Sequence, residues 1–408
     1  MEVGIVDVDL LDNGTRHPNL ALMKIAGYLR DNGISYKLLF DNNVDINNFK
    51  YIYSSKVFTY SKDPEFLNSF INKENIFTGG TGYYANEKNI EIFNRLRQED
   101  LTKLDNDPLL PGFSIKHQMP DYSLYDDFID KKIAEGKNPK YYKDYKLFSI
   151  GFLTRGCIRK CPFCVNKNID RVYNYSHVSD FVDEKRPRIY LWDDNFLASK
   201  NWKKLLNDLN ETKKPFQFRQ GLDIRLMTEE KADCLSNSRY YGDFIFAFDQ
   251  WKDRDMIKRK LAIWKKYCNR KTTKLYLFCG YKLNQSDDEK LFNDVLILFK
   301  RIEILMQYGC LGYVMRHEDY KKHPLGNIYT QIARWCNQPQ FYKKMSFEEF
   351  VVRNQTYQEE KFGSKKMCKT LRTYNEFKNK YFSRWYEIEP YFKMKFQNII
   401  DPALWSVK

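Results

Sequence analysis

The sequence predicts an α/β protein: a partial parallel (β/α)6 barrel, preceded by a small open parallel sheet and followed by a helical extension. Three observations support this fold class. Residues 3–40 run strand, helix, strand; apolar strands alternate with amphipathic helices from residue 146; and the pattern turns helical and aromatic-rich at residue 337. The chain has 408 residues, which is enough for two domains and an appended third piece.

The first domain is expected at residues 1–100, as a Rossmann-like unit. Its first strand, helix and second strand are VGIVDVDL at 3–10, HPNLALMKIAGYLRDNG at 17–33 and SYKLLF at 35–40. Apolar residues spaced by three and four give the helix one buried face, and Gly33 ends it. The apolar runs KYIYSS and NIFTGGTGYY add two short strands. In such open parallel sheets, ligands bind beyond the carboxyl ends of the strands.

A connector is expected at residues 101–145, which are rich in Pro, Asp and Tyr and show no sustained period. The barrel is expected at 146–336. Six predicted strands alternate there with helices, namely LFSIGFL, RIYLW, FQFRQ, DFIFAF, KLYLFC and LGYVMR. The helices are expected near 176–184, from 200, from 228, at 253–268 and at 287–308. The loops at the carboxyl ends of the strands should hold the chemistry.

The extension covers residues 337–408, where fourteen Lys or Arg stand against eight Asp or Glu and alternate with aromatic residues. One interpretation is an amphipathic helical extension whose aromatic side chains pack onto the barrel. The other is a cap that binds the substrate or nucleic acid. Over the whole chain Lys and Arg outnumber Asp and Glu by 68 to 53, a net charge of +15, so a nucleic-acid partner is a candidate.

The composition argues against a membrane protein, because no apolar run approaches the roughly 18 residues that a membrane-spanning helix needs. The first residues, MEVGIVDVDLLDNG, carry acids where a signal peptide carries bases, so we expect a cytoplasmic protein. Its nine cysteines are then not expected to form disulfides. Six of them stand singly, most simply as small buried apolar residues: Cys234, Cys268, Cys279, Cys310, Cys336 and Cys368.

The other three cysteines, Cys157, Cys161 and Cys164, lie in the loop GCIRKCPFC that follows the first barrel strand. Thiolates bind zinc or iron–sulfur clusters, and three are one fewer than most metal centres need. His177 would complete a structural zinc site with three cysteines and one histidine. The position of the loop, after the first strand of a β/α series, favours an active site instead.

The spacing Cys157-x3-Cys161-x2-Cys164, with the aromatic Phe163 before the last cysteine, resembles the motif of the radical S-adenosylmethionine (radical SAM) superfamily. The resemblance implies that the three thiolates hold a 4Fe–4S cluster, with Phe163 at the cofactor. It implies that the methionine moiety of S-adenosylmethionine chelates the fourth iron. It also implies reductive cleavage to a 5′-deoxyadenosyl radical, which abstracts hydrogen from an unidentified substrate. An electron donor such as flavodoxin or ferredoxin is then expected.

The loop after the second barrel strand matches the family less closely. Many members carry Gly-Gly-Glu there, whereas this chain has Trp192 followed by Asp193, Asp194 and Asn195. The polar side chains are candidates to bind the methionine ammonium group. The alternative is that Asp194 or Asn195 caps a helix.

The remaining candidate cofactor contacts follow later strands. The stretch RQGLDIR after the third strand supplies Gln220, Asp223 and Arg225. An internal Asp–Arg salt bridge is the alternative explanation for two of these residues. Asp249 ends the fourth strand, and Met315 ends the sixth together with Arg316; they are candidate contacts to adenosine and substrate.

The N-terminal domain resembles the cobalamin-binding domain found in one subgroup of the radical enzymes. The resemblance rests on HPNLALMKIAGYLRDNG, the Gly79-Gly80 strand end and PDYSLYDD in the connector. It implies cobalamin as a candidate cofactor, although the cobalt-ligating Asp-x-His-x-x-Gly motif is absent. The alternative is a domain that scaffolds the barrel or contacts substrate, in which His17 starts a helix and His117 lies in the connector.

The leading hypothesis is therefore a radical SAM enzyme that abstracts hydrogen, with methylation as the outcome where cobalamin binds. One alternative is methylthiolation or a related radical modification of RNA or protein, although methylthiolation in the family uses a second cluster and the six scattered cysteines supply no second group. The other is a non-catalytic module in which a metal braces a nucleic-acid-binding surface. The substrate cannot be named from the sequence.

Overall fold

The computed structural model describes residues 2–15, 17–41, 44–71, 73–84, 91, 107, 109–268, 272–363 and 366–406. It divides into two compact units, residues 1–216 and 217–408, which are described separately below. The end of the predicted first domain and the start of the connector lie largely outside the described residues. The predicted domain boundaries are not tested by this division and stay a prediction.

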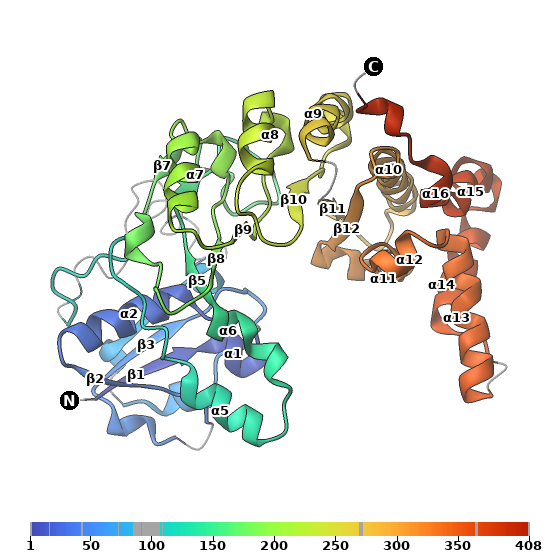
Figure 1. The fold of residues 1–408 in the computed structure, drawn as a ribbon. Helices are drawn as coiled ribbons and strands as arrows, with labels where there is room; N and C mark the ends of the chain where they lie inside the picture. The colour runs from blue at the N-terminus through green and yellow to red at the C-terminus, as the bar shows by residue number, and fades with distance from the viewer. Residues whose placement is uncertain are drawn as a thin grey trace. The chain divides into compact units, whose positions relative to one another are not determined.

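The first unit opens with a four-stranded parallel sheet in the order β2-β1-β3-β4, drawn in blue in Figure 1 with helix α2 against it. Its elements are β1 (Glu2–Asp7), α1 (Val8–Asn13), α2 (Leu20–Asp31), β2 (Ser35–Leu38), β3 (Tyr51–Ser55), β4 (Ile76–Gly79) and α3 (Thr81–Tyr84). The parallel order agrees with the open sheet that the sequence predicts. The predicted helix at 17–33 is α2, which begins after its N-cap, Asn19.

Two apolar clusters fill the two faces of this sheet. Side chains alternate along β1, so Val3 and Ile5 join the cluster formed with α2, whereas Val6 joins the cluster formed with Phe66 and Phe70. The connector packs against α2: the backbone N–H of Asp121 donates to Met23 O over 2.7 Å. The sheet is therefore covered on both sides, as a parallel sheet requires.

The rest of the first unit contains the helices and strands that precede and follow the cysteine loop. Its elements are α5 (Asp126–Ala134), α6 (Lys143–Leu147), β5 (Phe148–Gly151), β6 (Thr154–Gly156), β7 (Val172–Asn174), β8 (Arg188–Leu191) and α7 (Trp202–Glu211). Strands β5 and β8 pair in parallel, and β9 (Phe216–Phe218) follows α7 in the chain. The helix predicted near 176–184 is wrong: that stretch holds only the 3-10 turn η5 (Val178–Asp180), because Pro187 and the next strand leave too little room for an α-helix.

The second unit holds a three-stranded parallel sheet in the order β10-β11-β12. Its elements are α8 (Glu229–Ser236), β10 (Phe244–Ala247), α9 (Arg254–Tyr267), β11 (Thr273–Cys279), α10 (Asp288–Gln307) and β12 (Leu311–Arg316). Strands and helices alternate in the order that the sequence predicts, and α9 and α10 fall within the predicted helices at 253–268 and 287–308. Closure of the predicted strands into one partial barrel stays a prediction.

The C-terminal region is helical, as the sequence predicts. It contains α11 (Asn327–Cys336), α12 (Pro339–Tyr342), α13 (Phe347–Phe362), α14 (Lys369–Lys380), α15 (Trp385–Lys393) and α16 (Phe396–Ile399). Inward aromatic side chains pack on α10, where the rings of Phe299 and Phe392 have centroids 4.6 Å apart. This packing supports the interpretation of an amphipathic extension.

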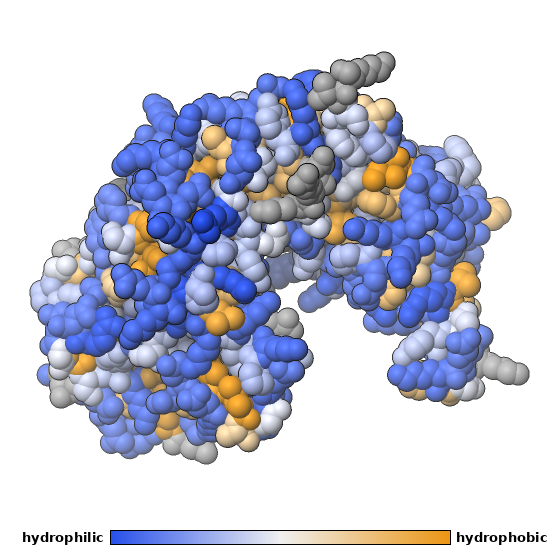
Figure 2. Space-filling view, viewed as in Figure 1, coloured by the Kyte–Doolittle hydropathy of each residue, from blue (hydrophilic) through white to orange (hydrophobic). Residues whose placement is uncertain are grey.

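The molecular surface is mostly hydrophilic on the face shown in Figure 2, with hydrophobic side chains scattered over it. Among the exposed aromatic residues of the C-terminal helices, Phe362, Phe382 and Tyr386 are the most exposed, at 67%, 74% and 73%. Single exposed aromatics of this kind are ordinary for a protein surface. No helix in the described residues is both long and apolar enough to cross a membrane.

Asp7, at the carboxyl end of β1, is a buried carboxyl group. Its Oδ1 accepts from the N–H of Leu10 over 3.2 Å and its Oδ2 accepts from the Tyr125 hydroxyl over 2.8 Å. Burial outweighs these bonds and raises the pKa of Asp7 to about 7. The folded protein therefore binds a proton at this group between about pH 4 and pH 7, where the unfolded chain has lost it.

We predict that Asp7→Asn changes the pH dependence of stability. As pH rises from about 4 to about 7, the wild type should lose up to about 4 kcal/mol of unfolding free energy relative to the variant, because only the wild type must ionise a buried carboxyl. Chemical denaturation at a series of pH values measures this difference. Asp31→Asn, at a half-exposed surface carboxylate, is the control, and a constant difference between wild type and Asp7→Asn would contradict the prediction.

Candidate metal centre at the cysteine loop

A short antiparallel hairpin holds the cysteine loop. Strands β6 and β7 pair with Thr154 opposite Asn174 and Gly156 opposite Val172, so they close the loop of residues 157–171 that contains all three cysteines of the motif. The loop follows β5 in the chain, and two residues separate the end of β5 from the start of β6. This hairpin is absent from the sequence prediction, because strands of three residues carry too few side chains to show a period of two.

Gly156 makes the entry to the loop possible. Its φ is +89°, which other residues adopt only with strain. A Cβ atom at this position would lie 2.3 Å from the carbonyl oxygen of Arg171 across the hairpin. Glycine is therefore required immediately before Cys157 by both backbone conformation and space.

The turn that follows β8 anchors the chain leading into the loop. Asp193 Oδ1 accepts from the backbone N–H and the hydroxyl of Thr154, both over 2.6 Å, and Oδ2 accepts from the N–H of Leu153 over 3.3 Å. Asp193 is 2% exposed, and burial raises its pKa to about 7 against the effect of these bonds. These contacts give Asp193 a structural role, and a cofactor contact by Asp193 stays a prediction.

The next two residues continue this anchor to the first cysteine. Asp194 Oδ2 accepts from the N–H of Gly156 over 2.8 Å and lies 3.7 Å from Arg155 Nε. Asn195 Nδ2 donates to Cys157 Sγ over 3.4 Å. Asn195 occupies the N-cap position of the 3-10 turn η6 (Phe196–Ala198), but its side chain makes no capping bond. The N–H of Trp192 donates to Gly151 O over 3.0 Å. We call residues 192–195, with their bonds to residues 151–157, the clamp.

Backbone N–H groups point at two of the three sulfurs. The N–H of Arg159 donates to Cys157 Sγ over 3.3 Å, and the N–H of Asn166 donates to Cys164 Sγ over 3.4 Å. The N–H of Cys164 donates to Cys161 O over 3.0 Å, which folds the second and third cysteines into one turn. N–H donors of this kind stabilise thiolate charge.

The pKa of Cys164 responds to the other two thiols of the motif. Burial is the main cause that raises the pKa of Cys164, and the nearby Cys157 and Cys161 raise it further, while the bond from Asn166 opposes them. Metal binding to such thiols releases protons. All three cysteines are partly exposed, so reagents reach them.

The three thiols stand in one loop, and backbone N–H groups are directed at Cys157 Sγ and Cys164 Sγ; this donor set fits the chemistry of a thiolate-ligated iron–sulfur centre. In the described part of the chain, which includes these three cysteines, no group of three or more His, Cys, Asp or Glu side chains is arranged to hold a metal ion. The fit therefore rests on the kind and spacing of the donors. His177, the alternative fourth ligand, stacks on His117 with ring centroids 5.9 Å apart, and its backbone N–H donates to Asp180.

The sequence analysis did not place His17 beside the clamp. Its ring meets the Trp192 ring edge-on at 5.3 Å, and its Nδ1 lies 2.8 Å from Asp144 Oδ2. A histidine that precedes α2 and an aspartate in the connector thus come together next to residue 192. Nothing local in either stretch signals this contact, since it depends on how the connector folds back.

The candidate residues of the RQGLDIR stretch lie in the second unit. Arg225 Nε donates to Asp223 Oδ1 over 2.7 Å, and Arg225 Nη1 donates to Asp253 Oδ2 over 2.7 Å. The salt bridge considered as the alternative is therefore present in the structure. Gln220 is exposed. Cofactor contacts by these residues stay predictions.

Asp249, Met315 and Arg316 follow the strands of the sheet in the second unit. Burial raises the pKa of Asp249, whose Oδ1 accepts from the N–H of Phe278 over 3.2 Å. Met315 is 43% exposed at the end of β12. Arg316 donates to the Thr330 hydroxyl over 2.7 Å. The structure thus leaves Met315 accessible and engages the other two with protein groups.

The sequence analysis also missed Arg301, a buried cation on α10. Its side chain donates to the carbonyl oxygens of Phe248, Asp249 and Phe278 at 2.9–3.1 Å. These bonds fix the chain at the carboxyl ends of β10 and β11. Asp249 lies just after β10. An arginine among the apolar positions of an otherwise buried helix is a signal that could have identified it.

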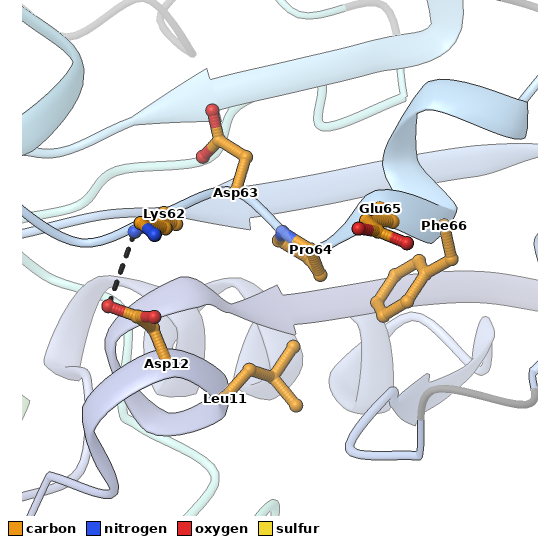
Figure 3. Close-up of a pocket in the computed structure, with 7 residues that line it drawn as sticks. All are labelled: Leu11, Asp12, Lys62, Asp63, Pro64, Glu65 and Phe66. Atoms are coloured by element: carbon orange, nitrogen blue, oxygen red, sulfur yellow. Dashed lines mark hydrogen bonds between the residues drawn. The ribbon is translucent and has the colours of Figure 1, made fainter.

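A separate pocket of about 410 Å³ lies in the first unit beside α1, and none of the residues that line it is a candidate site residue (Figure 3). Three acidic side chains, one lysine and three apolar residues line it, and the N–H of Lys62 donates to Asp12 Oδ2 over 3.3 Å. The loop that forms its wall is fixed by Asp9, which accepts from the N–H groups of Val57 and Phe58 and from the Ser61 hydroxyl. Its lining identifies no ligand class.

No protein-family model matches the chain, and no curated protein sequence matches it. Solved structures of Streptococcus suis SuiB resemble it at 11% sequence identity. The structure bound to S-adenosylmethionine has a TM-score of 0.30 and the match covers 59% of this chain and 62% of that one. The structure bound to the precursor peptide SuiA has a TM-score of 0.32, with 63% and 66% covered. The chain thus spans less than two thirds of these SuiB chains, and so weak a likeness assigns no activity.

We predict that Gly156→Ala disrupts the cysteine loop. The added methyl meets Arg171 O and the backbone strains, so we expect a loss of about 2–4 kcal/mol in unfolding free energy and weaker iron binding after anaerobic reconstitution. Gly136→Ala is the matched control: its φ is +86° and nothing lies within 4 Å of its added Cβ. The prediction would be contradicted if Gly156→Ala and Gly136→Ala lost the same unfolding free energy and bound iron equally well.

Proposed function

We propose that this protein is a radical SAM enzyme. The observation that carries the proposal is the loop with Cys157, Cys161 and Cys164, closed by the β6–β7 hairpin after the first strand of a β/α series. The spacing of the cysteines is the motif of that superfamily, and the N–H donors directed at Cys157 Sγ and Cys164 Sγ support metal ligation over a purely structural role.

In this proposal the three cysteine thiolates hold a 4Fe–4S cluster. When bound, that cluster supplies the electron that cleaves S-adenosylmethionine to a 5′-deoxyadenosyl radical. The protein's own tasks are to orient the thiolates and to keep water from the reacting groups. The clamp performs the first task, because Asp193 and Asp194 fix residues 153–156. A small redox protein such as flavodoxin or ferredoxin would deliver the electron.

The residues proposed to contact S-adenosylmethionine are supported by fewer observations than the three cysteines are. We retain Phe163 and Asn195 in the first unit, and Gln220, Asp249 and Met315 in the second, as candidates. Asp193, Asp194, Asp223 and Arg225 remain candidates whose polar groups already bond to protein groups. The substrate, and whether the outcome is oxidation or methylation, is not part of the proposal.

The proposed function does not include cobalamin as a cofactor. In the described part of the sheet edge, the residues at the ends of β1 and β3 bond to other segments of the chain: Asp7 Oδ2 accepts from the hydroxyl of Tyr125 in the connector over 2.8 Å, and the Ser55 hydroxyl accepts from Nδ2 of Asn19, the N-cap of α2, over 2.8 Å. Tyr125 is 1% exposed, and its hydroxyl bonds to Asp7 at the carboxyl end of β1, the edge at which such sheets bind their ligands. These residues do not form a cradle for a corrin ring, so we derive no methylation step from it.

We predict that Cys161→Ala abolishes iron–sulfur assembly and S-adenosylmethionine cleavage while the fold is retained, because the residue lies in a loop outside the core. Absorbance near roughly 400 nm after anaerobic reconstitution measures the cluster, and 5′-deoxyadenosine formed with dithionite measures cleavage. Cys234→Ala, at a single partly exposed cysteine of α8, is the control and should keep both properties.

Two outcomes would contradict the proposal. Cleavage that persists in Cys161→Ala would show that the loop does not hold the reactive centre. Stoichiometric zinc without the absorbance would favour a structural site and the non-catalytic alternative.

A further inference from the structure

We propose that the side-chain amide of Asn195 raises the reduction potential of the centre held by the cysteine loop. This inference rests on the radical SAM function proposed above. Asn195 Nδ2 donates to Cys157 Sγ over 3.4 Å. The amide comes from the turn after β8, 38 residues from the cysteine in sequence. The bond is therefore a product of the tertiary fold and not of the local turn of the loop.

The two backbone N–H donors to the cysteine sulfurs differ in origin from the Asn195 amide. Arg159 and Asn166 each use a backbone N–H two residues beyond the cysteine that they contact. Almost any residue in the same turn would supply these donors. Asn195 supplies a side-chain donor that substitution removes while the backbone stays the same, so its contribution can be measured alone.

Surrounding contacts hold the amide in place. Asn195 is 3% exposed, and its main-chain carbonyl oxygen accepts from the N–H of Ala198 over 3.1 Å, which fixes the backbone that carries the amide. Phe196 and Leu197, which follow it, are 1% exposed and fix the turn in the core. Because Asn195 and these neighbours are buried, the donor requires little reorganisation when the charge of the centre changes.

The sign of the effect follows from charge. One-electron reduction adds negative charge to an iron–sulfur centre and to its thiolate sulfurs. An N–H donor to a ligand sulfur stabilises the more negative state, and it does so more strongly in a buried, low-dielectric site. Removing the donor should therefore make reduction harder and move the midpoint potential to a more negative value.

The test compares wild type, Asn195→Leu and Asn195→Asp as full-length, anaerobically reconstituted proteins, in a redox titration followed by cluster absorbance. Leu keeps the volume and removes the donor. We expect a more negative midpoint potential, with the reduced-to-oxidised ratio at a fixed potential falling by about twofold to tenfold, the net effect of one hydrogen bond. Asp keeps the shape and puts a carboxylate at the sulfur, so it should move the potential further in the same direction.

Thr154→Val is the matched control. It removes a hydroxyl that donates to Asp193 within the same clamp and is not a donor to a sulfur, so it should lower the melting temperature and shift the potential less than Asn195→Leu does. A shift in this control as large as in Asn195→Leu would overturn the proposal, because loosening of the clamp would explain both. Unchanged potentials in the two Asn195 variants would also overturn it.

Failure of the inference is distinguishable from failure of the proposed function. If wild type assembles a cluster and cleaves S-adenosylmethionine but neither Asn195 variant assembles one, Asn195 serves assembly and the inference alone is overturned. If wild type itself assembles no cluster, both the function and the inference are overturned.

Discussion

The arrangement of the cysteine loop depends on one buried contact, between the Asp193 carboxylate and the backbone of Leu153 and Thr154. Burying a carboxyl group opposes folding, as the raised pKa of Asp193 shows, and three hydrogen bonds offset part of that cost. The contact ties the end of β8 to the chain between β5 and β6. The loop thereby takes its position from the parallel pairing of β5 with β8, which is part of the folded core.

Long periodic elements were predictable from the sequence, and short ones were not. Helix α10 (Asp288–Gln307) repeats its apolar face over many turns, so its predicted bounds at 287–308 are close to those observed. Strands β6 and β7 have three residues each and are defined by pairing with each other. The stretch at 176–184 contains a helical apolar spacing, but the nearby strands limit it to one 3-10 turn. Tertiary context decides such short segments.

The same contrast between local and long-range signals applies to the cysteine loop and the clamp. The three cysteines could be found because their spacing is local and their chemistry is distinctive. The partners of Asp193 and Asp194 could not, because they lie about 40 residues away and depend on the register that sets Gly151 opposite Leu191. Asp223 and Arg225 lie close enough in sequence for their salt bridge to be anticipated, and the structure contains it. Sequence identifies reactive side chains more readily than it identifies what holds them.

The closure of residues 157–171 by a hairpin affects the order in which the protein matures. A short loop whose ends are already joined loses little chain entropy on ordering, and none of its cysteines belongs to the core of the unit. The apolar clusters of the N-terminal sheet are complete without the loop. In the function proposed above, the polypeptide would therefore fold first and take up iron and sulfide afterwards, unlike a zinc finger, in which metal uptake and folding are a single event. Oxidative loss of the proposed cluster would then leave a folded protein that could be reloaded.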